Sequence, residues 1–368
     1  MRWGALTAGA LIWFELSYLI RVFPALFEMA KVSLHWPHVI ADSAVFLSQA
    51  PLHEGLNGWL QLLDPINEHR LVVSRALAVL PVSFGFQLGQ WSVLVSMALL
   101  GLTWLMFALS LLRLRFDAPL LDRIAVVLAM ALVLFNPWQA ENLIWDINVH
   151  WFLQGFLVAV AVFLMLARSE HLPCWFDLLL PGLALFNGGQ GVCVLLAVAL
   201  PRLVLYGRRW LFLASAISFL GVDRLLGGHS AQAGYSFSGV FSARLLSAWW
   251  PNAGWWLIVA VIVVAVGLLR AWPGLLPSDT RQLLICSIPI SYAALFAVAV
   301  HLSRSSISDG LFSRSGYVTP ALMLGVGLLL LLWKFLRRAH CCSGAFDRSS
   351  FGWFCCWGLS PLGQLESA

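Results

Sequence analysis

The sequence predicts an all-α protein that crosses a membrane many times, and two observations support this fold class. Of its 368 residues, 61% are hydrophobic and 11% are charged, whereas a soluble domain averages about 45–50% apolar and about 25% charged residues. The apolar residues also gather in long runs, and a membrane-spanning helix needs roughly 17–25 of them. One soluble core cannot bury this much apolar surface, so we expect a polytopic transmembrane helical bundle.

Roughly ten apolar runs approach the length of a span. In order along the chain they lie at 5–30, 72–112, 123–138, 147–168, 174–187, 188–206, 209–226, 252–270, 283–302 and 318–336. The first run contains Glu15 and no small-residue cleavage site follows it, so we expect a retained span and not a signal peptide. Residues 1–338 are therefore expected to form the transmembrane domain, and residues 339–368 a flexible cytoplasmic tail.

Two of these runs carry internal signals that alter their shape. Pro81, Gly85 and Gly89 interrupt the second run, which predicts a short helix near the surface and a full span from Trp91. The run at 174–187 is short and ends at "FNGGQG". Its glycines allow a sharp reversal of the chain within the membrane.

Lys and Arg residues predict the orientation of the bundle. With the N-terminus in the cytoplasm and strict alternation of spans, most basic residues fall on the inner side, as the positive-inside rule requires. These residues are Arg113, Arg115, Arg123, Arg168, Arg202, Arg208, Arg209, Arg270, Arg281, Lys334, Arg337 and Arg338. The same alternation places residues 31–70, 138–148, 227–250 and 303–317 outside.

A charged stretch in the first outer segment runs against this rule. "LLDPINEHRLVVSR" (62–75) contains Glu68, His69, Arg70 and Arg75 in a chain with few charges. Glu68 and Arg75 are seven residues apart and share a helix face, so a local ion pair is one explanation. A functional site is the other, because charges at membrane depth are often functional.

Further charges lie on the same outer side, among them Asp42 earlier in the first outer segment, and Glu141 and Arg314 in later ones. Together they place carboxylates and guanidiniums on one side of the membrane. Arg binds phosphate through two parallel hydrogen bonds, and a carboxylate can deprotonate an acceptor hydroxyl. This combination suits an anionic, lipid-linked substrate. The sequence has no P-loop, Rossmann, H-E-x-x-H or D-x-D motif and no metal-ligand spacing, so we expect no nucleotide, metal or other cofactor.

Four segments carry a resemblance to known proteins. The long first outer loop, with an acidic residue soon after the first span, resembles the GT-C superfamily of polyprenyl-phosphate-sugar-dependent glycosyltransferases. More narrowly, "DPINEHRLVVSRAL", "NPWQAENLIWDINVHWFL", "FNGGQGVCVLLAVALPRL" and "SRSGYVTPALML" resemble successive elements of a group of bacterial polytopic proteins with GT-C-like architecture. The resemblance covers residues 5–336 in order. It departs at Asp42-Ser43, where that group has two acidic residues, and at an extra residue between Arg314 and Tyr317.

The resemblance implies a role for each candidate residue. Asp42 is the expected base that activates the acceptor. The expected substrate-binding residues are Glu68, His69, Arg70, Arg75, Glu141 and Arg314, with Glu68, His69 and Arg70 shaping the donor phosphate site and Arg314 a second phosphate contact. The implied location is the bacterial cytoplasmic (inner) membrane, and the implied partners are a polyprenyl-phosphate-linked sugar donor and membrane lipids, with no nucleic acid.

Three functions stay open at this point. The first is a membrane glycosyltransferase that acts at the outer face of the membrane. The second is a transporter of a lipid-linked sugar or anion, which predicts inverted repeats and helices broken near the midplane. "FNGGQG" is one such break, but the sequence shows no matching one. The third is a non-catalytic membrane protein of a polysaccharide gene cluster. The ionisable residues gather at one face, which favours the transferase over the transporter.

Overall fold

The structure is a computed structural model. It describes residues 60–64, 70–85, 88–114, 120–136, 139, 142–143, 148–168, 171–207, 209–226, 277–304 and 318–345. Every regular element in these ranges is a helix, so the all-α class is confirmed for the described part of the chain. The spans expected at 5–30 and 252–270 lie outside these residues. Each of the other expected spans corresponds to at least one helix.

Three helices in the described ranges are long and apolar enough to cross a membrane. They comprise Trp91–Arg113, Val149–Ala167 and Asp279–Ala299. Shorter apolar helices pack between them, which fits a membrane protein. The total of roughly ten crossings and the cytoplasmic N-terminus stay predictions.

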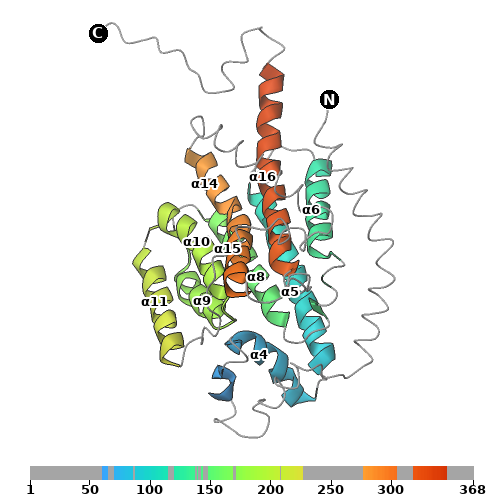
Figure 1. Cartoon of the computed structure of the whole chain (residues 1–368). Helices are drawn as coiled ribbons and strands as arrows, with labels where there is room; N and C mark the ends of the chain where they lie inside the picture. Colours follow the sequence, from blue (N-terminus) through green and yellow to red (C-terminus); the bar gives the residue numbers. More distant parts are fainter. Residues whose placement is uncertain are drawn as a thin grey trace, which may run out of the picture.

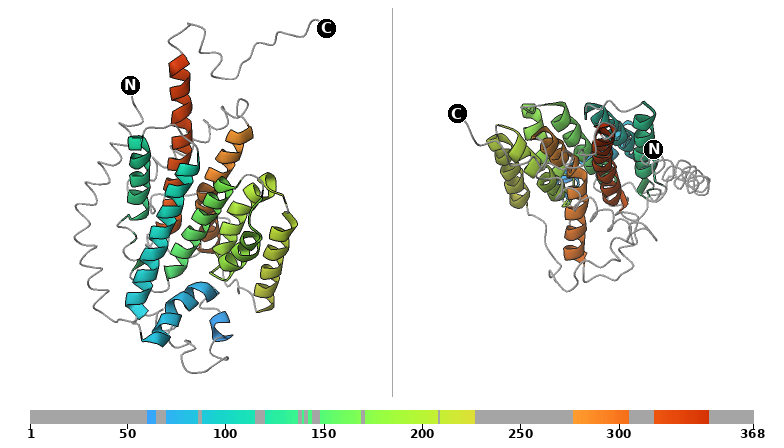
Figure 2. Two further views of the ribbon diagram at one scale, coloured as in Figure 1. Left: turned by 180° about the vertical axis from the view of Figure 1, so that it is seen from behind. Right: turned by 90° about the horizontal axis from the view of Figure 1, so that it is seen from above.

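The centre of the bundle is α8 (Val149–Ala167), with α5 (Leu88–Arg113) running beside it, as the view from behind shows (Figure 2). Within the most apolar 18-residue stretch of each helix, 72% of the residues are buried in α8 and 33% are buried in α5. The exposed face of α5 is nevertheless apolar, and includes Leu94, Leu102 and Leu105. An apolar face of this kind suits contact with lipid tails, because lipid supplies no hydrogen-bond partners.

The remaining helices surround this pair (Figure 1). α6 (Leu120–Leu134) lies against α5, where the Trp104 indole donates a hydrogen bond to the Val127 carbonyl at 3.0 Å. Further helices around the pair include α11 (Arg209–Leu225), α14 (Pro277–Cys286), α15 (Ile288–Arg304) and α16 (Val318–Ala345). α16 continues past residue 338, where the sequence suggested a domain boundary, and the rest of the expected tail lies outside the described residues.

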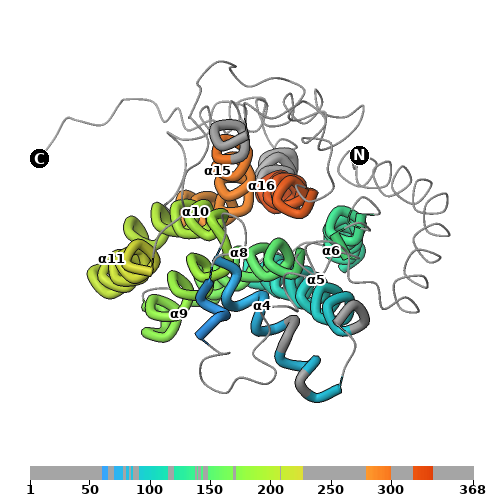
Figure 3. Tube along the Cα trace, turned by 60° about the horizontal axis from the view of Figure 1, so that its bottom comes forward, coloured from blue at the N-terminus to red at the C-terminus, as the bar shows by residue number. Residues whose placement is uncertain are grey.

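The second apolar run divides as the sequence predicts. α4 (Val72–Val79) is followed by the 3-10 helix η2 (Leu80–Phe84), and the chain turns at Gly85, whose φ of 87° lies in the left-handed region. α5 then begins at Leu88. Figure 3 shows α4 lying across the near ends of α8 and α9. We call this end of the bundle the α4 end, and the opposite end, where α14 begins, the α14 end.

The reversal expected at "FNGGQG" is also confirmed. α9 (Cys174–Leu185) and α10 (Gly191–Leu205) are about 18 and 22 Å long at 1.5 Å per residue. Both are shorter than a hydrocarbon core of about 30 Å. Gly188 has a φ of 106°, and a Cβ on Gly191 would lie 1.8 Å from the Ala184 carbonyl oxygen. Only glycine fits this close approach, and the two short helices reverse at the α4 end, against α4 itself.

Candidate functional site

Two of the predicted site residues are described by the structure. Arg70 and Arg75 lie at the α4 end, at the start of α4. Asp42, Glu68, His69, Glu141 and Arg314 lie outside the described residues. Their roles, including that of Asp42 as the base, stay predictions.

Arg70 joins two segments that are far apart in the sequence. Its side chain is 2% exposed, and its Nε donates to Oδ1 of Asp223 near the end of α11 at 2.9 Å. Its Nη2 donates to the Leu226 carbonyl at 3.0 Å, and its Nη1 donates to the Leu63 carbonyl. All three nitrogens of this guanidinium therefore bond protein acceptors. The arrangement fastens residues 60–64 and the start of α4 to the end of α11.

Arg75 is fully buried one turn into α4. Its Nη1 donates to the Gln61 carbonyl at 2.8 Å. Burial lowers the pKa of Arg75, and the nearby Asp64 carboxylate opposes that shift. An arginine stays charged at neutral pH, so the α4 end holds two buried cations. Both arginines thus have structural partners, Asp223 and backbone carbonyls, whereas the expected Glu68–Arg75 ion pair lies outside the described residues.

A buried polar network lies beneath α4, between α8, α15 and the α9–α10 turn. Gln154 is fully buried and donates from Nε2 to the Asn187 carbonyl at 3.0 Å and to Oε1 of Gln190 at 3.4 Å. Tyr292 donates to Oε1 of Gln154 at 3.0 Å, and Asn187 donates to the His150 carbonyl at 3.0 Å. Burying polar groups in lipid is unfavourable unless they are hydrogen-bonded, so these bonds hold the turn in place.

A second buried network joins the start of α16 to the chain before α8. Asn142 donates to Oγ1 of Thr319 at 3.0 Å, and Thr319 donates to Oε1 of Gln139. Asn148 donates to Oδ1 of Asn142 at 3.1 Å and accepts a hydrogen bond from the Trp151 indole at 3.2 Å. Amide and hydroxyl side chains thus line the inside of the bundle on the N-terminal side of α8.

α4 packs directly against the α9–α10 turn. The backbone N–H of Val73 donates to the Phe186 carbonyl at 3.2 Å. A Cβ on Gly188 would lie 3.1 Å from Cδ2 of Leu71. The residue after Arg70 therefore touches the same glycine turn whose Asn187 takes part in the first network.

These contacts bring together the four segments that carry the sequence resemblance. "NEHRLVVSR" supplies Leu71 and Val73, next to Arg70, and "ENLIWDIN" supplies Asn142 and Asn148. "FNGGQG" supplies Asn187 and Gln190, and "YVTPAL" supplies Thr319. We call this meeting point the four-segment junction.

Several residues of the junction were not singled out from the sequence. Gln154 and Tyr292 interrupt apolar runs, and a polar residue inside such a run is the signal that could have identified them. Asp223 lies beside Arg224 near the end of an apolar run, where the sequence gives no sign of a distant partner. The structure buries it instead and pairs it with Arg70.

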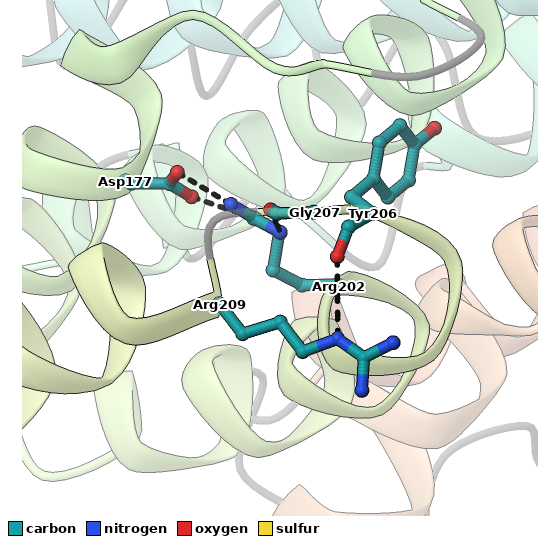
Figure 4. A network of polar contacts seen from close by, with 5 residues as sticks. All are labelled: Asp177, Arg202, Tyr206, Gly207 and Arg209. Atoms are coloured by element: carbon teal, nitrogen blue, oxygen red, sulfur yellow. Dashed lines mark hydrogen bonds and ion pairs between the residues drawn. The ribbon is translucent and has the colours of Figure 1, made fainter.

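Basic residues that the sequence assigns to the inner side gather at the α14 end. Arg202 forms a two-pronged ion pair with Asp177, at 2.7 Å from Nε and 2.6 Å from Nη2, and donates from Nη1 to the Gly207 carbonyl at 2.8 Å (Figure 4). Lys334 pairs with Asp279 at 2.6 Å. Residues assigned to one side of the membrane thus share one end of the bundle, and Arg70 lies at the other.

No protein family model matches the sequence, and it matches neither a curated protein nor a solved structure. The function therefore has to be argued from the site itself.

Proposed function

We propose that the protein is a membrane glycosyltransferase that takes a sugar from a polyprenyl-phosphate-linked donor, with its site at the α4 end. The observation that carries this proposal is the four-segment junction. The segments that resemble GT-C-like proteins are spread over the chain, yet they lie at one end of the bundle, and three of them supply side chains to its two buried polar networks. Alternating helices bring such segments to one side of any bundle, so the support lies in the buried amide and hydroxyl groups that these segments supply.

The chemistry needs two kinds of group at a membrane surface. The bond between the anomeric carbon and the phosphate oxygen breaks, the acceptor oxygen bonds that carbon, and the acceptor hydroxyl loses its proton. A carboxylate is suited to take the proton, and cations stabilise the negative charge on the departing phosphate. We assign the proton to Asp42 and the phosphate to His69 and Arg314, with Glu68 and Glu141 completing the site.

Arg70 and Arg75 have a supporting role in this proposal. The Arg70 nitrogens already bond Asp223 and two carbonyls, so Arg70 acts as a positioning residue that fixes the segment carrying Glu68 and His69. The Asp223 carboxylate neutralises Arg70, so Arg75 is the buried guanidinium that adds positive charge at the α4 end, where the proposed donor phosphate binds.

The amide network offers a place for an uncharged, hydroxyl-rich group. Oδ1 of Asn187 is buried and accepts no hydrogen bond from any described residue. A buried acceptor is normally satisfied by a donor from protein, water or ligand. A sugar hydroxyl is such a donor, and the polar groups that surround Asn187 are of the kind that orient a ligand in a pocket.

One observation favours the transporter as the second candidate. The α9–α10 reversal is a helix break inside the membrane with a polar network at its tip, which is typical of substrate sites in transporters. Both candidates bind a lipid phosphate, but only the transferase needs a base.

Binding of the lipid is the first test. Full-length protein is purified in detergent, and undecaprenyl phosphate is titrated against it by native mass spectrometry, with phosphatidylcholine as the control lipid. We expect retention of undecaprenyl phosphate over phosphatidylcholine, reduced in Arg314→Gln and unchanged in Arg113→Gln, an exposed arginine at the end of α5 that lies away from α4. Equal retention of both lipids would remove the basis of both candidates.

A further inference from the structure

A chain of buried hydrogen bonds leads from α15, through α8 and the α9–α10 turn, to the start of α4. Its first two members, Tyr292 on α15 and Gln154 on α8, are fully buried. The Tyr292 hydroxyl donates to Oε1 of Gln154 at 3.0 Å, and Nε2 of Gln154 donates to the Asn187 carbonyl at 3.0 Å. Gln154 is therefore the point at which α15, α8 and the α9–α10 turn are joined.

The direction of each bond at Gln154 is fixed by the chemistry of its partners. A backbone carbonyl can only accept, so the Gln154 atom that faces the Asn187 carbonyl is the amide nitrogen. The amide oxygen then faces Tyr292, and because this oxygen can only accept, the Tyr292 hydroxyl must donate. Removing the hydroxyl leaves Oε1 of Gln154 buried without a donor, which is unfavourable. The orientation of the Gln154 amide thus depends on Tyr292.

α8 holds the α9–α10 turn at two points. The Asn187 side chain donates to the His150 carbonyl at 3.0 Å, and Gln154 donates to the Asn187 backbone carbonyl. Residues 150 and 154 are four apart, so they lie on the same face of α8. Asn187 is therefore fixed through both its side chain and its backbone, which also fixes the adjacent carbonyl of Phe186.

The Phe186 carbonyl supplies a cap that α4 lacks. The first amides of a helix have no partner within the helix, and Leu71 at the N-cap position of α4 makes no side-chain cap hydrogen bond. The backbone N–H of Val73 donates instead to the Phe186 carbonyl at 3.2 Å. α4 lies across α8 and α9 at this point (Figure 3). A shift of the α9–α10 turn would therefore remove a hydrogen bond from the start of α4.

We propose that Tyr292 and Gln154 are positioning residues through which α15 fixes the start of α4. The Tyr292 hydroxyl orients the Gln154 amide, the amide holds the α9–α10 turn, and the turn caps α4. Buried hydrogen bonds joined in this way act together more strongly than separate pairs. The consequence for the reaction rests on the proposed function, because Glu68 and His69 come directly before Arg70 and α4.

Hydrogen exchange of the full-length protein in detergent, followed by mass spectrometry, tests this proposal. In Tyr292→Phe we expect peptides that contain Val73 to exchange about fivefold faster, as for the loss of one hydrogen bond. Tyr206→Phe is the matched control. The Tyr206 hydroxyl is also buried and also donates to a carbonyl, that of Met165, but it lies at the α14 end. It should leave the exchange of α4 unchanged.

A second variant tests the order of the chain. Gln154→Leu removes the central amide, so α4 should again exchange about fivefold faster, and adding Tyr292→Phe to Gln154→Leu should cause no further rise. The comparison of Tyr292→Phe with Tyr206→Phe decides the matter alone if Gln154→Leu does not fold. Each measurement is made without substrate, so its result does not depend on the proposed transferase activity.

Three results would overturn the proposal. One is unchanged exchange of α4 in Tyr292→Phe. Another is an equal rise in Tyr206→Phe, which would mean a general loss of stability. The third is a further rise when Tyr292→Phe is added to Gln154→Leu, which would mean that Tyr292 acts on α4 by a path that avoids Gln154. Loss of sugar addition in cells at unchanged α4 exchange would likewise count against positioning by these residues and leave the proposed function standing.

Discussion

Arg70 and Asp223 show how a charged pair can persist in so apolar a chain. Each is buried, and each would be strongly unfavourable without the other, because lipid and protein interior solvate charge poorly. Their positions lie 153 residues apart. The sequence indicates that Arg70 needs a partner, but it cannot identify Asp223, because local spacing carries no information about a contact between distant helices.

Removing Asp223 should destabilise the protein. Asp223→Ala leaves Arg70 buried without its carboxylate, which typically costs about 3–5 kcal/mol. Thermal unfolding of the purified protein, followed by Trp fluorescence at one scan rate, should show a clearly lower midpoint. Arg224→Gln is the matched control and should shift the midpoint little, since an exposed substitution usually changes stability by about 0.5 kcal/mol or less. Equal midpoints for the two variants would mean that the ion pair contributes nothing.

The Arg70→Lys variant tests whether Arg70 acts by positioning its segment through hydrogen bonds or by its positive charge alone. Lys keeps the charge but has one nitrogen, and cannot reach Asp223 and both carbonyls together. We expect a lower thermal midpoint together with weaker function. Loss of function at an unchanged midpoint would show instead that Arg70 contacts the substrate, as the sequence resemblance implies.

At the scale of elements, glycine and proline were the most informative residues. They located the division of the second run into α4 and α5 and the reversal between α9 and α10. The apolar runs predicted where the helices lie but not where they end. A helix can continue beyond the residues that contact lipid, and an apolar run does not show this. α16 thus continues to Ala345, and α6 ends at Leu134. The networks of Gln154 and Asn142 depend on packing between helices, which a single sequence does not specify.

Gly191→Ala should disrupt the α9–α10 reversal. The new methyl group would lie 1.8 Å from the Ala184 carbonyl oxygen, so the two helices must move apart and α4 loses its contact with the turn. We expect a large drop in the thermal midpoint. Gly101→Ala on α5 is the control, because a Cβ there meets nothing within 4 Å and alanine favours a helix interior by about 0.5–1 kcal/mol. A Gly191→Ala protein as stable as the control would refute the close approach.

At the scale of the whole molecule, the two ends differ in chemistry. The α4 end has Arg70, Arg75 and amide side chains, and the α14 end has a basic cluster. Of the residues that the sequence assigned to the inner side, Arg168, Arg202, Arg281 and Lys334 lie at the α14 end. Which end faces the cytoplasm rests on the positive-inside rule alone.

Labelling of single cysteines tests this orientation. In a background without native cysteines, a membrane-impermeant thiol reagent should label Gly55→Cys and Gly310→Cys in intact cells. Ala118→Cys and Leu275→Cys should be labelled only after the membrane is opened. The reverse pattern would place the α4 end in the cytoplasm and remove the proposed transferase from the outer face.

The central claim is that the α4 end transfers a sugar from a lipid phosphate with Asp42 as the base. The most direct measurement is mass spectrometry of cell-envelope glycans from cells that lack the gene and carry it back as wild type, Asp42→Asn or Ser43→Ala. We predict that wild type and Ser43→Ala restore the same sugar addition. Asp42→Asn, at an equal protein level in the membrane, should reduce this sugar addition by about 10²–10⁴-fold, which is the usual contribution of a general base. Full restoration by Asp42→Asn would contradict the account.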